Sequence, residues 1–286
     1  MPELTTDGLR LHWEEHIPKH ETGHPVILLH GLGSSGEDWL LQTPALGMQR
    51  RLLAPDLPGH GRSQGFRHWP RIEDFAVAVS AMLRETHAEP AHVVGLSLGG
   101  AVALQLAVDS PEQVASLVIA NGLARFRPSL EVLALGSVWL GRVLSGRMED
   151  VAEWVAADLF PKPDQAGLRE EAAVRLARNR RSDYLRAVAA AAFFNIWPRL
   201  GSVTCPTLIV SGELDRVFPV ERQREIAGGI RGARMVVVPD SRHATPIDSP
   251  DLFNRLVIDF MVAAELGRSG PWSVVRGQTS RIPTGP

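Results

Sequence analysis

The chain has 286 residues, of which 44% are hydrophobic and 22% are charged, and its formal net charge at pH 7 is −2. This length and composition are typical of one large globular domain, or of a domain with an insertion. No apolar run is long enough to cross a bilayer, and no Lys/Arg cluster is interleaved with aromatic residues. The sequence therefore argues against a membrane span and against a nucleic-acid surface.

The first residues do not have the pattern of an export signal. They include acidic residues and lack a basic start followed by an unbroken apolar run. The single cysteine, Cys205, has no partner for an internal disulfide and precedes Pro206 at the start of an apolar run, so we expect its side chain to pack. These features predict a cytoplasmic location.

Short apolar runs suggest a sheet. The chain opens with two alternating segments around Asp7-Gly8, a pair that favours a tight turn, and this predicts an antiparallel hairpin. Six further runs have the continuous apolar character of strands buried on both faces, and helical patterns separate several of them. The sequence therefore predicts an α/β fold with a mostly parallel, eight-stranded sheet flanked by helices. The six runs are residues 25–31, 51–56, 91–97, 115–122, 205–213 and 233–240.

The strand pattern stops over residues 122–200, where the sequence becomes helical, and this predicts an inserted helical cap. The core is then made of residues 1–121 and 201–266, ending in an amphipathic helix that begins after Ser249 and runs to about Leu266. Residues 267–286 are rich in Gly, Pro and Ser without periodicity and are predicted to be a disordered tail.

Ser97 stands where a strand pattern ends and a helix pattern begins. Residues 92–94 are short and apolar, whereas residues 98–108 are rich in Ala and Leu. Gly95 and Gly99 give the Gly-x-Ser-x-Gly spacing of a nucleophile elbow. A sharp strand-to-helix turn is strained and needs glycine neighbours, so we predict that it projects a nucleophilic hydroxyl. The alternative is a chance loop.

A serine hydroxyl needs a base, and a group that orients the base, before it can attack at neutral pH. His243 lies on a loop after the last predicted strand, at the carboxyl edge of the sheet, where ligand crevices form. Asp215 follows an earlier strand and is expected to face the same edge, whereas Glu213 is expected to be a turn residue. The order Ser97, Asp215, His243 predicts a catalytic triad. The alternative for His243 is an ordinary surface histidine.

Two backbone amides are predicted to stabilise the oxyanion of a tetrahedral intermediate. The Leu98 amide heads the helix after the serine, where the helix dipole also favours negative charge. The Leu32 amide lies in the loop of residues 30–33, whose glycines allow it to turn into the site. His30 is expected to brace this loop rather than to act as a base.

Neither a metal site nor a cofactor is predicted. His12, His16 and His20 are four residues apart, but they fall in a predicted strand and loop instead of on one helix face. Residues 54–63 carry two prolines and lack the Gly-x-x-x-x-Gly-Lys spacing of a phosphate loop, so they are interpreted as a structural turn. The expected partner is a small-molecule ester or lactone, and the oligomeric state is left open.

Aromatic residues are candidates for contact with a substrate, although at helical spacing most aromatic side chains pack in a core. Arginines of the predicted cap gather in residues 175–186, a run typical of a solvated helix face. We therefore expect an apolar pocket that prefers an uncharged ester, because burying an unpaired carboxylate is costly. The candidates are Trp39, Phe126, Trp139, Trp154, Phe193 and Trp197.

From residue 3 to about 266 the sequence resembles the α/β-hydrolase superfamily. The motifs that carry the resemblance occur in the expected order: HGLGSS, DLPGHGRS, GLSLGG, GELD and SRHATPIDSP. The resemblance implies the same triad, the same oxyanion amides and the same cap, and it is greatest to small esterases, enol-lactonases and cofactor-free haloperoxidase-like hydrolases. Haloalkane dehalogenases and epoxide hydrolases use Asp at the elbow, so Ser97 argues against both. Many members place the acid after the sixth strand, but Asn121-Gly122 offers no carboxylate there, which favours Asp215.

The sequence thus predicts a serine hydrolase that cleaves a small to medium, largely apolar carboxylic ester through an acyl-enzyme. Hydrolysis of an enol-lactone or of a carbon–carbon bond is an alternative, because meta-cleavage hydrolases share a serine triad. A slow-turnover ligand sensor on the same fold is a less favoured alternative from another class.

Overall fold

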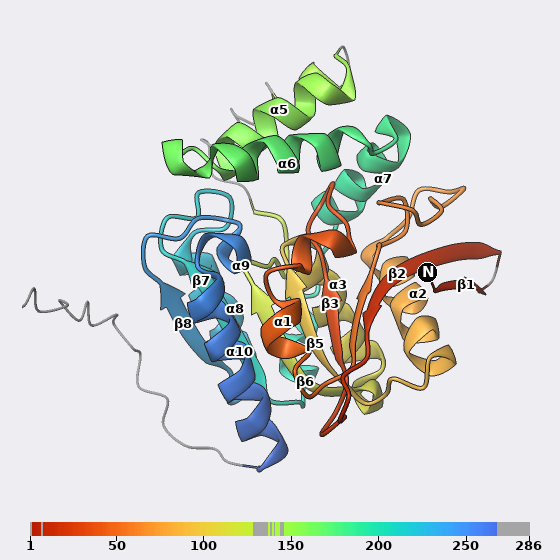
Figure 1. Cartoon of the computed structure of the whole chain (residues 1–286), viewed down its shortest axis with the longest axis vertical. Helices are drawn as coiled ribbons and strands as arrows, with labels where there is room; N and C mark the ends of the chain where they lie inside the picture. Colours follow the sequence, from red (N-terminus) through yellow and green to blue (C-terminus); the bar gives the residue numbers. More distant parts are fainter. Residues whose placement is uncertain are drawn as a thin grey trace, which may run out of the picture.

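The computed structural model describes residues 2–6, 8–127, 137, 139, 141–143 and 146–267. The strands of these residues are β1 Glu3–Thr6, β2 Leu9–His16, β3 Val26–Leu29, β4 Leu52–Pro55, β5 Ala91–Leu96, β6 Val114–Ala120, β7 Thr207–Gly212 and β8 Arg234–Val238. They form one 8-stranded sheet in the order β1-β2-β4-β3-β5-β6-β7-β8 (Figure 1). β2 pairs antiparallel with β1 and with β4, and the other pairs are parallel.

This sheet confirms the mostly parallel architecture predicted from the sequence. Every residue of β3, β4 and β7 is buried, which explains why these runs are apolar throughout instead of alternating. The opening hairpin is also present, with Thr6 paired to Leu9. Asp7 of its predicted turn lies outside the described residues.

Helices cover both faces of the sheet (Figure 1). Those of the described residues are η1 Gly36–Trp39, α1 Thr43–Leu46, α2 Ile72–Glu85, α3 Leu98–Asp109, η2 Pro111–Gln113, α5 Met148–Leu159, η3 Pro163–Gln165, α6 Ala166–Ala177, α7 Arg181–Ala192, η4 Trp197–Ser202, α8 Val220–Gly229, α9 Thr245–Asp248 and α10 Pro250–Glu265. Apolar side chains of α2, α3 and α8 form the core on one face, and those of η1, α1 and α10 form it on the other. In the part of the chain that the structure describes, no helix has the length and apolar character that a membrane span needs.

The regular elements of the described residues between β6 and β7 are helices, and the strand-type contact there is the isolated bridge between Arg125 and Asn195. Figure 1 shows α5 and α6 side by side above the edge of the sheet where α9 begins. A small apolar cluster with Val151 of α5, Leu176 of α6 and Tyr184 of α7 holds these helices together. This arrangement supports the proposal that the segment is a cap on the core.

The predicted disordered tail falls almost wholly outside the described residues, since residues 268–286 are not among them. The predicted last helix is present as α10, Pro250–Glu265. Cys205 packs against the core, as expected, and burial raises the pKa of its thiol to about 11.

Glu265, at the end of α10, connects the last helix to the edge of the sheet where β3, β4 and β5 begin. Its carboxylate accepts two hydrogen bonds of 2.7 Å from the Arg50 guanidinium and one of 3.0 Å from the His24 amide. It also accepts one of 3.1 Å from Nε2 of His92 in β5. The hydrogen bonds from Arg50 hold the pKa of Glu265 well below its usual range, whereas burial lowers the pKa of His92 to about 4.

The lowered pKa of Glu265 makes its contribution to stability dependent on pH. The contribution is fully present at neutral pH and declines as the pH falls below the ordinary value of 4.5, because the unfolded carboxyl then binds a proton that the folded one excludes; it is lost when the pH falls through the lowered pKa of the folded protein. We expect Glu265→Gln to lower the free energy of unfolding by about 2 kcal/mol at pH 7 and by a smaller amount at pH 3. Urea unfolding at the two pH values, with exposed Glu85→Gln as control, measures this difference, and an equal loss at both would contradict it.

Candidate functional site

Ser97 forms the turn between β5 and α3 in a strained conformation, with φ 54° and ψ −112°. A side chain other than glycine rarely adopts a positive φ and does so mainly where the surrounding structure enforces it. The surroundings are tight backbone contacts: a Cβ on Gly95 would lie 2.4 Å from the Gly99 carbonyl oxygen, and one on Gly99 would lie 2.1 Å from that of Leu29. The motif therefore lies in a true strand–turn–helix junction, which removes the alternative of a chance loop.

His243 and Asp215 are hydrogen-bonded, with 2.8 Å between Nδ1 and Oδ2. Asp215 follows β7, and its other oxygen accepts hydrogen bonds from the amides of Val217 at 2.8 Å and Phe218 at 3.0 Å. The Asp215 side chain is fully buried and that of His243 is 16% exposed. Because a carboxylate can only accept, Nδ1 carries the proton, and Nε2 is the basic nitrogen of the neutral ring.

Two opposing effects act on the pKa of His243. Burial alone would lower it, but the charge of Asp215 and the hydrogen bond to it outweigh burial, and the pKa is raised above the ordinary 6.5. Asp158 and Asp248 add smaller effects of the same sign. The Phe218 ring lies against the imidazole, with 5.6 Å between the ring centroids.

Asn121, which directly follows β6, holds the loop that carries His243. Its Nδ2 lies 2.7 Å from the His243 carbonyl oxygen, 3.2 Å from that of Arg242 and 2.7 Å from Oγ1 of Thr245. Its Oδ1 accepts a hydrogen bond of 2.8 Å from the amide of Gly212, at the end of β7. One buried amide therefore joins the ends of three segments.

Asn121 is also close to the nucleophile elbow, because the residue before it accepts a hydrogen bond from Ser97. The Ser97 amide donates to the carbonyl of Ala120 at 3.0 Å, and Ala120 precedes Asn121. In the sequence this position is notable only for lacking a carboxylate, so the hydrogen bonds of Asn121 to the His243 loop were not predicted. The available signal is a polar residue, fully buried here, at the carboxyl end of an apolar strand.

The loop with the predicted oxyanion amide of Leu32 lies against the elbow, since a Cβ on Gly31 would be 3.6 Å from Cβ of Ser97. His30 braces it: Nδ1 donates to the Gly31 carbonyl at 2.7 Å, and Nε2 accepts from the Leu57 amide at 2.9 Å. Burial lowers the pKa of His30 to about 4, so the ring is neutral at pH 7. Both ring nitrogens are engaged in these bonds, which agrees with the expected bracing role of His30.

The turn over residues 54–63 is structural, as expected. The buried carboxylate of Asp56 accepts hydrogen bonds of 2.8 Å from the amides of Gly36 and Arg62. These bonds fix the start of η1 against the turn. Within the described residues, no group of three or more His, Cys, Asp or Glu side chains could hold a metal ion.

The helical segment between β6 and β7 is hydrogen-bonded to the loop of residues 30–33 and to α9, which supports the His243 loop. Nδ2 of Asn179 donates to the Gly33 carbonyl at 2.6 Å, next to the predicted oxyanion amide. Nε2 of Gln165 donates to Asp248 at 2.8 Å, and the other oxygen of Asp248 accepts from the Arg242 amide at 2.7 Å. The segment therefore lies over the site and is connected to its supports.

Comparison with known proteins decides the family. Residues 26–256 match the family model described as the alpha/beta hydrolase family. The chain belongs to the α/β hydrolase family. This hydrolase is 31% identical over 262 residues to a protein of Variovorax paradoxus strain S110 named as a carbamate hydrolase, RutD, and the match covers 88% of this chain and 96% of the relative.

Solved structures agree with this fold. The enol-lactonase from Burkholderia xenovorans LB400 superposes with a TM-score of 0.83 at 24% identity, covering 91% of this chain and 100% of that one. A thermophilic esterase from Thermogutta terrifontis gives a TM-score of 0.73 at 25% identity and covers 92% of this chain and 98% of that one.

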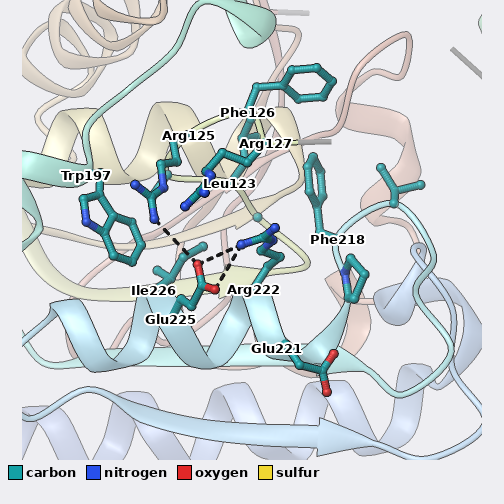
Figure 2. Close-up of a pocket in the computed structure, with 14 residues that line it drawn as sticks. Leu123, Arg125, Phe126, Arg127, Trp197, Phe218, Glu221, Arg222, Glu225 and Ile226 are labelled. Carbon is teal, nitrogen blue, oxygen red and sulfur yellow. Dashed lines mark hydrogen bonds and ion pairs between the residues drawn. The ribbon is translucent and has the colours of Figure 1, made fainter. Parts of the chain in front are cut away.

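Two of the six aromatic candidates in this hydrolase, Phe126 and Trp197, line a pocket of about 390 Å³ (Figure 2). The pocket lies between the segment after β6, η4 and the start of α8. Three arginines and two glutamates line it together with apolar side chains. Ser97 and His243 are not among the lining residues.

The other aromatic candidates lie elsewhere. Trp39 is 2% exposed and packs against Phe253, which places it in the core rather than at a cavity. Phe193 is 89% exposed at the end of α7, so its ring faces solvent. Trp139 packs near the ring of Tyr184 and Trp154 is half-buried on α5, and substrate contact by these two stays a prediction.

The opposing effects on His243 predict the direction in which its pKa departs from the ordinary value, with and without the charge of Asp215. In the wild type the imidazole should titrate above 6.5, whereas Asp215→Asn should bring the pKa below 6.5, because burial persists while the negative charge is lost. NMR titration of the imidazole, assigned with a His243→Gln variant, measures both values. Asp259→Asn, an exposed change on α10, serves as control, and a pKa in Asp215→Asn as high as the wild type's would contradict this account.

Proposed function

We propose that this hydrolase cleaves small to medium, largely apolar carboxylic esters through an acyl-enzyme on Ser97. The observation that carries the proposal is the hydrogen bond between Asp215 and His243, because it makes Nε2 of a histidine with a raised pKa available as a base. The strained strand-to-helix turn at Ser97 supports it, since a nucleophile elbow holds its serine in such a turn.

In the first half of the reaction, Oγ of Ser97 bonds to the ester carbonyl carbon and its proton passes to Nε2 of His243. The carbonyl electron pair moves to the oxygen, whose negative charge the amides of Leu32 and Leu98 stabilise. When this tetrahedral intermediate collapses, the bond to the alkoxy oxygen breaks. The alcohol leaves with the proton from His243, and the acyl group stays on Ser97.

The second half regenerates the enzyme. A water molecule gives a proton to His243 and bonds to the acyl carbon, and the second tetrahedral intermediate again has its charge on the carbonyl oxygen. The bond to Oγ then breaks, Ser97 takes the proton from His243, and the carboxylic acid leaves. Throughout, Asp215 holds the ring and stabilises its positive charge without taking the proton.

The nucleophile is tested with p-nitrophenyl acetate. Ser97→Ala should lower kcat/KM by more than about a thousandfold, because no other group in the proposed mechanism forms the acyl-enzyme. Ser110→Ala, at the other end of α3, is the matched control and should keep the wild-type value. Equal release of p-nitrophenol by wild type and Ser97→Ala would show that the serine is not the nucleophile.

Carbamate hydrolysis is a second candidate, because relatives that are 28%, 30% and 31% identical to this chain are named as carbamate hydrolases. The same steps apply, with an amine or an alcohol leaving from a carbonyl that also carries nitrogen. Matched p-nitrophenyl ester and carbamate substrates, together with an enol-lactone, separate the candidates when each rate is divided by its uncatalysed rate. We expect the largest enhancement for the ester, and a larger one for carbamate or lactone would replace the ester proposal.

Asn121 is proposed to position the histidine loop. Asn121→Ala removes the donors to the His243 and Arg242 carbonyls, so kcat should fall by about 100-fold while KM changes little, since a displacement of about 1 Å is enough to misalign the base. Asn254→Ala is the matched control, because Asn254 is another buried asparagine that donates to a carbonyl, that of Leu41. Equal losses of kcat in the two variants would indicate a general effect on stability instead.

A further inference from the structure

Arginine side chains converge in the pocket of Figure 2. Arg125, Arg127 and Arg222 line it together with Glu221 and Glu225. Figure 2 shows the three guanidinium groups around the carboxylate of Glu225, whereas the carboxylate of Glu221 points away from them. Three positive groups therefore face one negative group.

Glu225 neutralises only part of this charge. It is ion-paired with Arg222 at 3.0 Å and with Arg125 at 3.7 Å. Arg127 is exposed and has no ion pair among the described residues. Since a carboxylate of a ligand would meet guanidinium groups already held near one another, the cost of assembling such a site is small.

Aromatic rings form two walls of the same pocket. Figure 2 shows Trp197 on one side and Phe218 on the other. The guanidinium of Arg125 lies over the Trp197 ring, 3.8 Å from its centroid, and is thereby held at the wall. Leu123 and Ile226 complete an apolar lining. A flat ring therefore fits between the Phe218 ring and the Arg125 guanidinium that covers Trp197.

Charge and shape together select one class of ligand. Guanidinium groups bind a planar carboxylate through paired hydrogen bonds, while aromatic walls favour a ring. The volume of about 390 Å³ is within the usual range for small-molecule pockets, roughly 300–1,000 Å³. We propose that this pocket binds a small aromatic carboxylate, with its ring between Phe218 and the Arg125 guanidinium that covers Trp197, and with its carboxylate on Arg127 and Arg222.

This pocket is separate from the site of the chemistry, although the two share a wall. Ser97 does not line the pocket, but Phe218 does, and its ring also packs against His243. The Phe218 amide is one of the donors that fix Asp215. A ligand in the pocket therefore touches the support of the Asp215–His243 pair, and its binding does not require the ester hydrolysis proposed above.

Calorimetry on Ser97→Ala protein tests the proposal without turnover. Benzoate and naphthoate should bind at least about tenfold more tightly than benzamide, a neutral molecule of similar shape. Arg222→Gln should weaken benzoate binding about tenfold and Arg127→Gln several-fold. Arg231→Gln, the same charge change at an exposed position outside the lining, should leave it unchanged.

Glu225→Gln provides a test of opposite sign. It removes the negative charge that competes for Arg125 and Arg222, so benzoate should bind several-fold more tightly, a result that loss of folding could not produce. Equal binding of benzoate and benzamide, no binding at millimolar benzoate, or equal affinities in Arg222→Gln and Arg231→Gln would overturn the proposal. Each of these results would leave the ester hydrolase proposal standing, since Ser97 takes no part in the measurement.

Discussion

The candidate site depends on one buried side-chain amide, that of Asn121. Parallel strands bring their carboxyl ends to one edge of the sheet, but this alone does not fix the loops that leave that edge. Asn121 does so with hydrogen bonds to the chain at Gly212, Arg242 and His243. Because an unpaired buried amide or carbonyl is costly, the network holds these loops in a single arrangement.

Burial and hydrogen bonding at this edge also set the charge of Asp215 and the pKa values of His243 and His30. Asp215 is buried, yet each of its oxygens accepts a hydrogen bond, so the carboxylate keeps its charge where water is excluded. That charge reverses the effect of burial on His243, whereas His30, buried without such a partner, has its pKa lowered to about 4. At one edge of the sheet, His243 is thus the base of the proposed mechanism and His30 is a brace. The difference comes from their neighbours, because His243 has a carboxylate partner and His30 does not.

The sequence could predict what local pattern determines. The apolar runs predicted the sheet, and the glycines around Ser97 predicted its turn, because these features depend on neighbours within a few residues. Asn121 escaped prediction because its partners lie about a hundred residues further along the chain. Trp39 was placed at a pocket because it follows a site loop, but only packing against Phe253 of α10 shows that it fills the core.

The charged pocket could not be predicted from the sequence for the same reason. Arg125, Arg127 and Arg222 come from two segments, and each looks like an ordinary surface arginine in the sequence. Their convergence depends on how the segment after β6 crosses the start of α8. Similarly, composition predicted a helical insertion, but the contact of Asn179 with Gly33 depends on where that insertion docks.

The most direct test of the central claim is covalent labelling with a fluorophosphonate, which reacts with a serine only when a neighbouring base activates it. Intact mass and peptide mapping identify the labelled residue. The account predicts one adduct per chain, on Ser97, formed far more slowly in His243→Gln and in Asp215→Asn. An adduct on another residue, or equal labelling of Ser97 in wild type and His243→Gln, would contradict it.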